Sequence, residues 1–357
     1  MYRICKFPFI CAVALYLLII SATGCMPIGY LLSDATGELL LLASTVPIED
    51  GLNDPALSEE QREKLAFVIR ARDYAGEVIG LNIGNSYQGF LNIGDEALAW
   101  NLNASKKDVF EPYIFELPVV GSMPYFVFFV FDQAVVERDR LVALGYDTMI
   151  YEVDSYSLAI VPDPITSSML RRDLATLAET VMHELLHNTI YKLGDSVFNE
   201  SLATFVGRKG AIEFIRSEFG SDSPLADEAE QTFEDDDRFN VFLQELTAEV
   251  NEVYSSGLSY DEKLAAREEI FESARNRFAA DVLPLINDKE AYERYTEFNY
   301  NNAFLLVNVR YNSDPEVYEG IYEMVGGDWF QALTIFSQAA GANDPVGFLR
   351  GILAGNN

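Results

Sequence analysis

The sequence predicts an α+β protein with strands in its N-terminal half and a mainly helical C-terminal half. Between residues 82 and 131, short aromatic or β-branched runs alternate with Gly, Pro, Asn and Asp, which is typical of strands separated by turns. After residue 210, apolar residues recur at intervals of three and four, as they do on one face of a helix. We therefore divide the chain into a signal segment (1–24), an α+β region (25–165) and a helical region (166–357).

The composition indicates a globular protein with a large core and an acidic surface. Hydrophobic residues make up 49% and aromatic residues 13% of the chain, which argues against disorder. The 56 acidic and 25 basic residues give a net charge of −31. Such a charge repels nucleic acids and anionic lipid head groups, so we expect no nucleic-acid partner. It attracts cationic ligands such as the amino termini of peptides.

The first residues have the pattern of an export signal. Arg3 and Lys6 precede an apolar run at 7–20, and small residues follow at 21–24. Ala22-Thr23-Gly24-Cys25 resembles a bacterial lipoprotein signal, although Ala22 stands where Leu is usual. That resemblance implies that Cys25 carries lipid and tethers the protein to a membrane of the bacterial cell envelope, facing the periplasm or the exterior. A retained single membrane anchor is the alternative.

The elements expected along the chain follow from local patterns. Ser58 is an N-cap residue in front of a charged, amphipathic stretch at 59–80. The continuously apolar run at 126–131 predicts a central strand covered on both faces. We expect helices at 29–45, 59–80, 133–145, 171–190, 197–207, 233–254 and 260–282, and strands at 86–91, 97–101, 113–117, 124–131 and 156–161.

The helix predicted at 171–190 carries His183-Glu184-Leu-Leu-His187 and with it both histidines of the chain. Residues four apart on a helix share a face, so the two imidazoles can hold one metal ion. Glu184 can then reach a water molecule at that ion, which is the HExxH arrangement of zinc peptidases.

A catalytic zinc ion needs a third protein ligand, and Glu200 on the next predicted helix is our choice. Ala203 and Gly207 would let that helix pack closely beside the first. Imidazole and carboxylate ligands without a thiolate favour zinc, one ion per chain. Asp195 either hydrogen-bonds a ligand histidine or serves only as the N-cap of the second helix.

A family resemblance extends over most of the chain after the signal. It is carried by the HELLH motif, Gly194-Asp195, 198–207, Gly29-Tyr30, Ser86-Tyr87, Trp100, 118–121, Pro124-Tyr125, 145–147, Tyr156-Ser157, Asp163-Pro164 and 301–303. In these residues the sequence resembles the bacterial predicted-aminopeptidase lipoproteins, which belong to the gluzincin group of zinc peptidases. The resemblance implies a zincin-like fold with His183, His187 and Glu200 as zinc ligands, Glu184 as general base, and Asn199 beside the third ligand.

The resemblance also suggests where the substrate binds. In such peptidases an edge strand before the metal-binding helix pairs with the substrate backbone, which points to Tyr156 and Ser157. In such peptidases a hydrogen-bond donor from beyond the third ligand stabilises the charged intermediate. With no further histidine in the chain, that donor would be a Tyr, Arg, Asn or backbone group, and Tyr300 and Tyr311 are candidates.

We therefore expect a membrane-anchored, zinc-dependent peptidase that acts on peptides, and specifically an aminopeptidase. Two alternatives remain open at this point. One is a zinc endopeptidase of the cell envelope, and the other is a non-catalytic zinc-containing lipoprotein.

Overall fold

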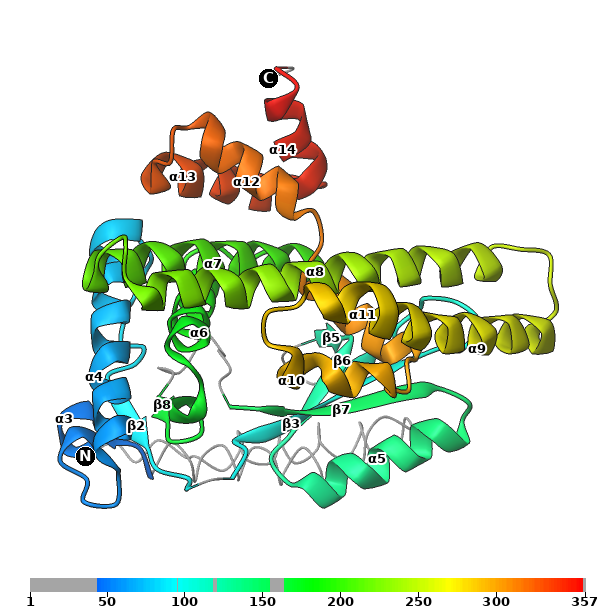
Figure 1. The fold of residues 1–357 in the computed structure, drawn as a ribbon, viewed down its shortest axis with the longest axis horizontal. Coiled ribbons are helices and arrows are strands. Elements are labelled where there is room, and N and C mark those ends of the chain that lie inside the picture. The colour runs from blue at the N-terminus through cyan, green and yellow to red at the C-terminus, as the bar shows by residue number, and fades with distance from the viewer. Residues whose placement is uncertain (1–43, 95, 118–120, 155–163, 356–357) are drawn as a thin grey trace, which may run out of the picture.

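The computed structural model describes residues 44–94, 96–117, 121–154 and 164–355, and it confirms the α+β class (Figure 1). Within these ranges the strands lie in the N-terminal half, and every element after β8 (Ile165–Thr166) is helical. Three predicted features lie outside the described residues: Cys25, the strand at 156–161 with Tyr156 and Ser157, and all but the last two residues of the helix at 29–45.

The helix predicted at 59–80 forms in two parts. α4 (Glu59–Tyr74) continues into one π-helical turn at Ala75–Ile79. Ser58 and Gln61 form a reciprocal capping box, in which each side chain accepts a hydrogen bond from the other residue's backbone N–H. Beside α4 lie α3 (Ile48–Leu52) and a small sheet in the order β1 (Val46–Pro47), β2 (Gly89–Leu91), β8.

A second sheet has the order β6 (Tyr125–Phe128), β3 (Ala99–Ser105), β7 (Asp147–Val153), with both pairings antiparallel. The predicted central strand at 126–131 is therefore wrong, because β3 is the central strand of this sheet as described. The apolar run belongs to two elements, because its first residues end β6 and its last residue, Phe131, begins α5 (Phe131–Ala143). The Phe131 ring packs on Trp100 with ring centroids 5.3 Å apart. The pattern analysis also missed β7.

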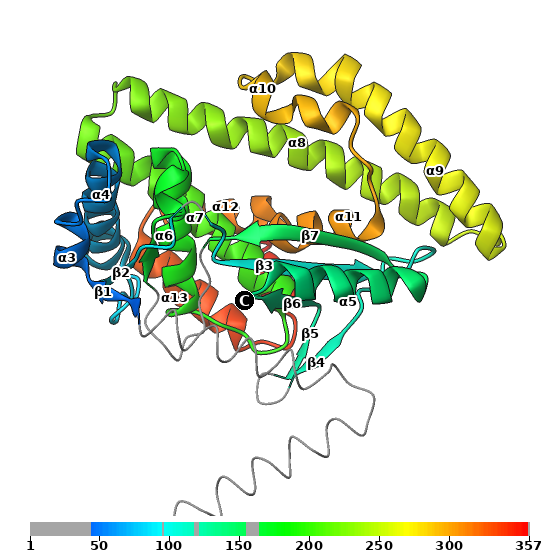
Figure 2. The same ribbon diagram turned by 90° about the horizontal axis from the view of Figure 1, so that it is seen from below.

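The two faces of this sheet differ in chemistry. Helix α5 covers one face, and Figure 2 shows the sheet between α5 and α11 (Asn302–Tyr311). The α5 side is apolar, with a core cluster of Leu102, Ala104, Phe115, Phe126, Phe128, Ala134 and Leu141. A hairpin of β4 (Phe115–Leu117) and β5 (Gly121–Met123) adjoins it.

The helical half is built on α6 (Leu174–His187) and α7 (Ser196–Phe219), which pack against each other and against α4. These three helices share the largest apolar core, which extends to the C-terminal helices above them (Figure 1). A second aromatic core joins the long hairpin of α8 and α9 to α11. The remaining bounds are α8 (Pro224–Tyr254), α9 (Tyr260–Arg277), α10 (Lys289–Tyr292), α12 (Pro315–Met324), α13 (Trp329–Ala340) and α14 (Pro345–Leu353).

Within the described ranges, no helix combines the length and the apolar character that crossing a membrane requires.

Candidate functional site

Helices α6 and α7 approach each other closely because small residues line their contact. An ideal Cβ placed on Gly207 would lie 2.9 Å from the backbone oxygen of Glu179 and 3.4 Å from the Cβ of His183. Ala203, one turn earlier on α7, is fully buried. The close packing that the sequence predicted for this helix pair is therefore confirmed, and it brings the face of α7 that carries Glu200 against the histidines of α6.

The side chains of His183, His187 and Glu200 converge. Glu200 Oε2 lies 3.1 Å from His183 Nε2 and 3.5 Å from His187 Nε2, and potential ligand atoms of the three residues lie within 4.8 Å of one another. Ligands about 2.0–2.1 Å from a tetrahedral zinc ion would lie roughly 3.3 Å apart, so these spacings fit one ion. The structure thus brings together the three residues that were predicted as metal ligands.

The electrostatics of these three residues also suit a cation. Burial alone would raise the pKa of Glu200, but hydrogen bonds and charge interactions with His183 and His187 outweigh it and hold the pKa well below its usual range. Burial is the largest single effect on His183 and lowers its pKa, but the hydrogen bond and charge of Glu200, together with the charges of Glu184 and Glu179, raise that pKa overall. A carboxylate held ionised between two imidazoles is a favourable place for a metal ion.

Glu184 lies on α6 between the two histidines and is partly buried. Burial lowers the pKa of His183, and Glu200 raises it. The negative charge of Glu184 also raises the pKa of His183, by less than Glu200 does, so Glu184 lies close enough to act on that histidine. A carboxylate so close to the metal-binding group can accept a proton there.

Tyr311, one of the two predicted tyrosines, lies at the site. Its ring stacks on His183 with centroids 6.0 Å apart. The hydroxyl of Ser201, the residue after Glu200, donates to the backbone oxygen of Arg310 at 2.9 Å and accepts from the N–H of Ser313 at 3.0 Å, which fixes the end of α11 to α7. Burial, followed by the charge of Glu200, raises the pKa of Tyr311 well above 10, so its hydroxyl keeps its proton and can donate it in a hydrogen bond.

The family model described as "Putative aminopeptidase" matches residues 29–343. The chain belongs to this family. A search of curated proteins and a search of solved structures found no match.

Tyr300 is not brought to the metal-binding group. It precedes α11, whereas Tyr311 ends it, and ten residues of helix place the two roughly 15 Å apart. The Tyr300 ring lies in the second aromatic core, and its hydroxyl donates to the backbone oxygen of Tyr295 at 3.1 Å. In this member of the aminopeptidase family, Tyr300 therefore packs in the core and is not at the metal-binding group.

Asp195 and Asn199 hold the connection between α6 and α7 instead of contacting a ligand histidine. Asp195 is the N-cap of α7, and its carboxylate accepts from the N–H of Phe198 at 3.1 Å. Asn199 accepts from the N–H of Lys192 and donates to the oxygen of the same residue, both at 2.8 Å. His187 Nδ1 is buried and has no hydrogen-bond partner among the described residues. Of the two alternatives for Asp195, the structure shows the N-cap, and within the described part of the chain no hydrogen bond joins Asp195 to a ligand histidine.

Three tyrosines to which the sequence assigned no role at the site also lie within the field of Glu200. Burial and the charge of Glu200 raise the pKa of Tyr125 on β6, Tyr151 on β7 and Tyr191 beyond α6. Tyr191 packs edge-on to His187 with ring centroids 6.2 Å apart. Tyr125 and Tyr151 come from separate strands, and no spacing in the sequence connects them with HELLH, whereas Tyr191 follows His187 by four residues.

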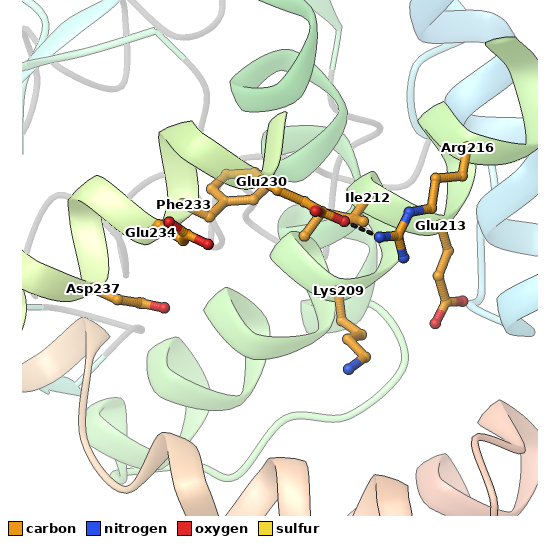
Figure 3. A pocket seen from close by; sticks show the side chains of 8 residues that line it. All are labelled: Lys209, Ile212, Glu213, Arg216, Glu230, Phe233, Glu234 and Asp237. Carbon is orange, nitrogen blue, oxygen red and sulfur yellow. Dashed lines mark hydrogen bonds and ion pairs between the residues drawn. The ribbon is translucent and has the colours of Figure 1, made fainter. Parts of the chain in front are cut away.

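A hollow of about 270 Å³ lies between α7 and α8 (Figure 3), and none of the three predicted ligands lines it. Its charged side chains are already engaged: Arg216 pairs with Glu230, Lys209 with Glu319, and Glu213 accepts from Tyr322 and Trp329. We assign no function to it. It is lined by Lys209, Ile212, Glu213, Arg216, Glu230, Phe233, Glu234 and Asp237.

Proposed function

We propose that the protein is a zinc-dependent peptidase that removes residues from the amino terminus of peptides. The observation that carries this proposal is the convergence of His183, His187 and Glu200 within 4.8 Å of one another, with Glu184 on the same helix. Two imidazoles and one carboxylate, with no thiolate among the three, form a donor set typical of catalytic zinc. When bound, zinc would polarise the peptide carbonyl and lower the pKa of a water molecule.

The residues of the chain supply the proton transfers and the charge stabilisation. Glu184 accepts a proton from the attacking water and delivers it to the leaving nitrogen. Tyr311, which stays protonated, donates a hydrogen bond to the carbonyl oxygen as negative charge develops on it. Both groups lie on elements tied directly to the metal-binding group, α6 itself and α11 through Ser201, so their positions are fixed by the fold.

Two further features favour an aminopeptidase over an endopeptidase. The family description names this activity for the matched region. The net charge of −31 attracts the positive amino termini of peptides. We also propose that lipid on Cys25 tethers the enzyme to a membrane of the bacterial cell envelope, as the residues before this cysteine suggest.

Matched peptides with free and N-acetylated amino termini test this function. We expect the zinc-loaded protein to cleave the free peptides and to release amino-terminal residues, and the acetylated peptides to be poor substrates. Glu184→Gln should keep the fold and the metal and lose about 10²–10⁴-fold in rate. Equal cleavage of both peptide forms would favour the endopeptidase, and zinc binding without any cleavage would favour the non-catalytic lipoprotein.

A further inference from the structure

Arg310 is buried beside the metal-binding group and has no acidic partner among the residues that the structure describes. Two arginines are buried in the described part of the chain, Arg267 at 5% exposure and Arg310 at 4%. Arg267 forms an ion pair with Asp147 at 2.6 Å and also donates to the backbone oxygen of Lys107. Arg310 donates to the neutral amide of Asn103 at 3.1 Å, and no described carboxylate lies within 4.0 Å of it. A buried charge is costly unless it is paired, so Arg310 is a place for an anion.

The end of α11 alone does not explain this charge. A positive side chain in the last turn of a helix gains about 0.3–1 kcal/mol from the helix dipole, which is small beside the cost of burying a guanidinium. The ring of Tyr125 faces Arg310 with its centroid 4.9 Å from Cζ, and this contact keeps the guanidinium in place without neutralising it.

The sheet face under α11 is polar, in contrast to the apolar face under α5. Asn103 pairs with Tyr125 of β6 in register, and Asn101 pairs with Tyr151 of β7, so these four side chains share one face. Asn101 and Asn103 are both buried. The Tyr151 hydroxyl is also buried, and its polar neighbours among the described residues are the neutral side chains of Asn103 and Tyr311. A guanidinium without a described acidic partner and a buried hydroxyl with only neutral polar neighbours lie on the same face, which indicates a binding site for a negatively charged group.

This polar face is within reach of the reaction centre. Arg310 directly precedes Tyr311, which stacks on His183, and Ser201 ties the backbone of Arg310 to α7 beside Glu200. Burial and then the charge of Glu200 raise the pKa of Tyr125, while the charge of Arg310 lowers it. The Tyr125 hydroxyl therefore lies close enough to interact with both Glu200 and Arg310. Tyr125, Tyr151 and Tyr311 each keep some exposure, whereas Arg310 is almost fully buried behind them.

We propose that Arg310, with the hydroxyls of Tyr125 and Tyr151, binds a carboxylate of the peptide substrate next to the metal-binding group. This inference rests on the peptidase function proposed above and names its substrate class: peptides that carry a carboxylate close to the scissile bond. The carboxylate is either the carboxy terminus of a short peptide or an acidic side chain. A guanidinium binds both with the same two parallel hydrogen bonds.

Binding to the zinc-loaded, full-length Glu184→Gln protein tests the proposal, because this variant should bind peptides without cleaving them. Calorimetry would compare Ala-Ala-Ala as the free acid with its carboxy-terminal amide, and Ala-Glu-Ala amide with Ala-Gln-Ala amide. We expect the carboxylate member of at least one pair to bind about tenfold more tightly or better, and the pair that shows it identifies the source of the carboxylate.

Further substitutions in the same background identify the groups responsible. Arg310→Met should abolish the preference and leave the affinity for the neutral peptide unchanged, and Tyr151→Phe should reduce the preference several-fold. Arg138→Met, which removes a positive charge from the exposed surface of α5, is the matched control and should leave the preference intact. The proposal is overturned if neither pair shows a preference, or if the preference survives in Arg310→Met. The comparison of acid with amide needs neither of these substitutions, so it holds even if Arg310→Met misfolds.

Cleavage by the unaltered enzyme separates this inference from the proposed function. Cleavage without a carboxylate preference would refute the role of Arg310 alone. A carboxylate preference that depends on Arg310, in a protein that cleaves no peptide, would refute the peptidase and leave the anion site standing.

Discussion

Substituting Gly207 by alanine should separate α6 from α7. The added Cβ would lie 2.9 Å from the backbone oxygen of Glu179, and an ordinary contact needs 3.4 Å, so the helices must move apart by about 0.5 Å. Alanine is the better helix former by about 1 kcal/mol. Overpacking against a backbone atom that cannot rotate away costs about 1–3 kcal/mol. We therefore expect Gly207→Ala to lower the free energy of unfolding by about 1 kcal/mol.

The same displacement should weaken metal binding. Gly207 follows Glu200 by two helical turns on one face of α7, so a shift at Gly207 also loosens the contact between Glu200 and the two histidines. We expect the zinc affinity to fall about tenfold, as is usual when the support of a metal ligand is disturbed.

Denaturant unfolding and a competitive zinc titration would measure both effects. The matched control is Gly320→Ala on α12, where the new Cβ meets only the mobile end of Leu353 at 3.2 Å. The control should be neutral or stabilising and should bind zinc normally. A Gly207→Ala protein that is more stable than the original and binds zinc equally well would refute the argument that close packing of α6 and α7 positions Glu200.

Three further predictions follow from individual contacts. Asn199→Ala should lower the free energy of unfolding by about 1–3 kcal/mol, since it removes both hydrogen bonds between the Asn199 amide and the backbone of Lys192, and an unchanged unfolding midpoint would contradict this. Tyr311→Phe should retain zinc and lower kcat/KM about 10²–10³-fold, whereas an unchanged kcat/KM would assign the stabilising hydrogen bond elsewhere. Cys25→Ser should move the protein from the membrane fraction to the soluble fraction, and mass spectrometry of the amino-terminal peptide should find lipid on Cys25 in the original; an unmodified thiol would remove the lipoprotein proposal.

The metal-binding group could be predicted from the sequence because helical periodicity alone determines most of it. His183 and His187 share a face whatever the rest of the fold does, and small residues on α7 indicated the close contact that brings Glu200 to them. The choice between Tyr300 and Tyr311 needed the structure, because the two residues lie at opposite ends of the same helix and only its docking on α7 decides which end reaches His183.

The sheet was predicted less well, for reasons of burial. β7 is buried at Asp147 and mostly half-exposed beyond it, and its polar face lies under α11, so it lacks the alternation of apolar residues that marks a strand. β6 was overextended because Phe131, which belongs to α5, continues the apolar run of the strand. The grouping of Arg310 with Tyr125 and Tyr151 was not predicted, since α11, β6 and β7 contribute these residues from positions up to 185 residues apart.

The zinc content of the purified protein tests the central claim most directly. Elemental analysis should find one zinc per chain in the original protein. His183→Ala, His187→Ala and Glu200→Ala should each lose most of it while retaining the fold, because two remaining ligands hold the ion weakly. An original protein that takes up no zinc, or a Glu200→Ala protein that keeps one zinc per chain at unchanged affinity, would contradict the metal centre described here.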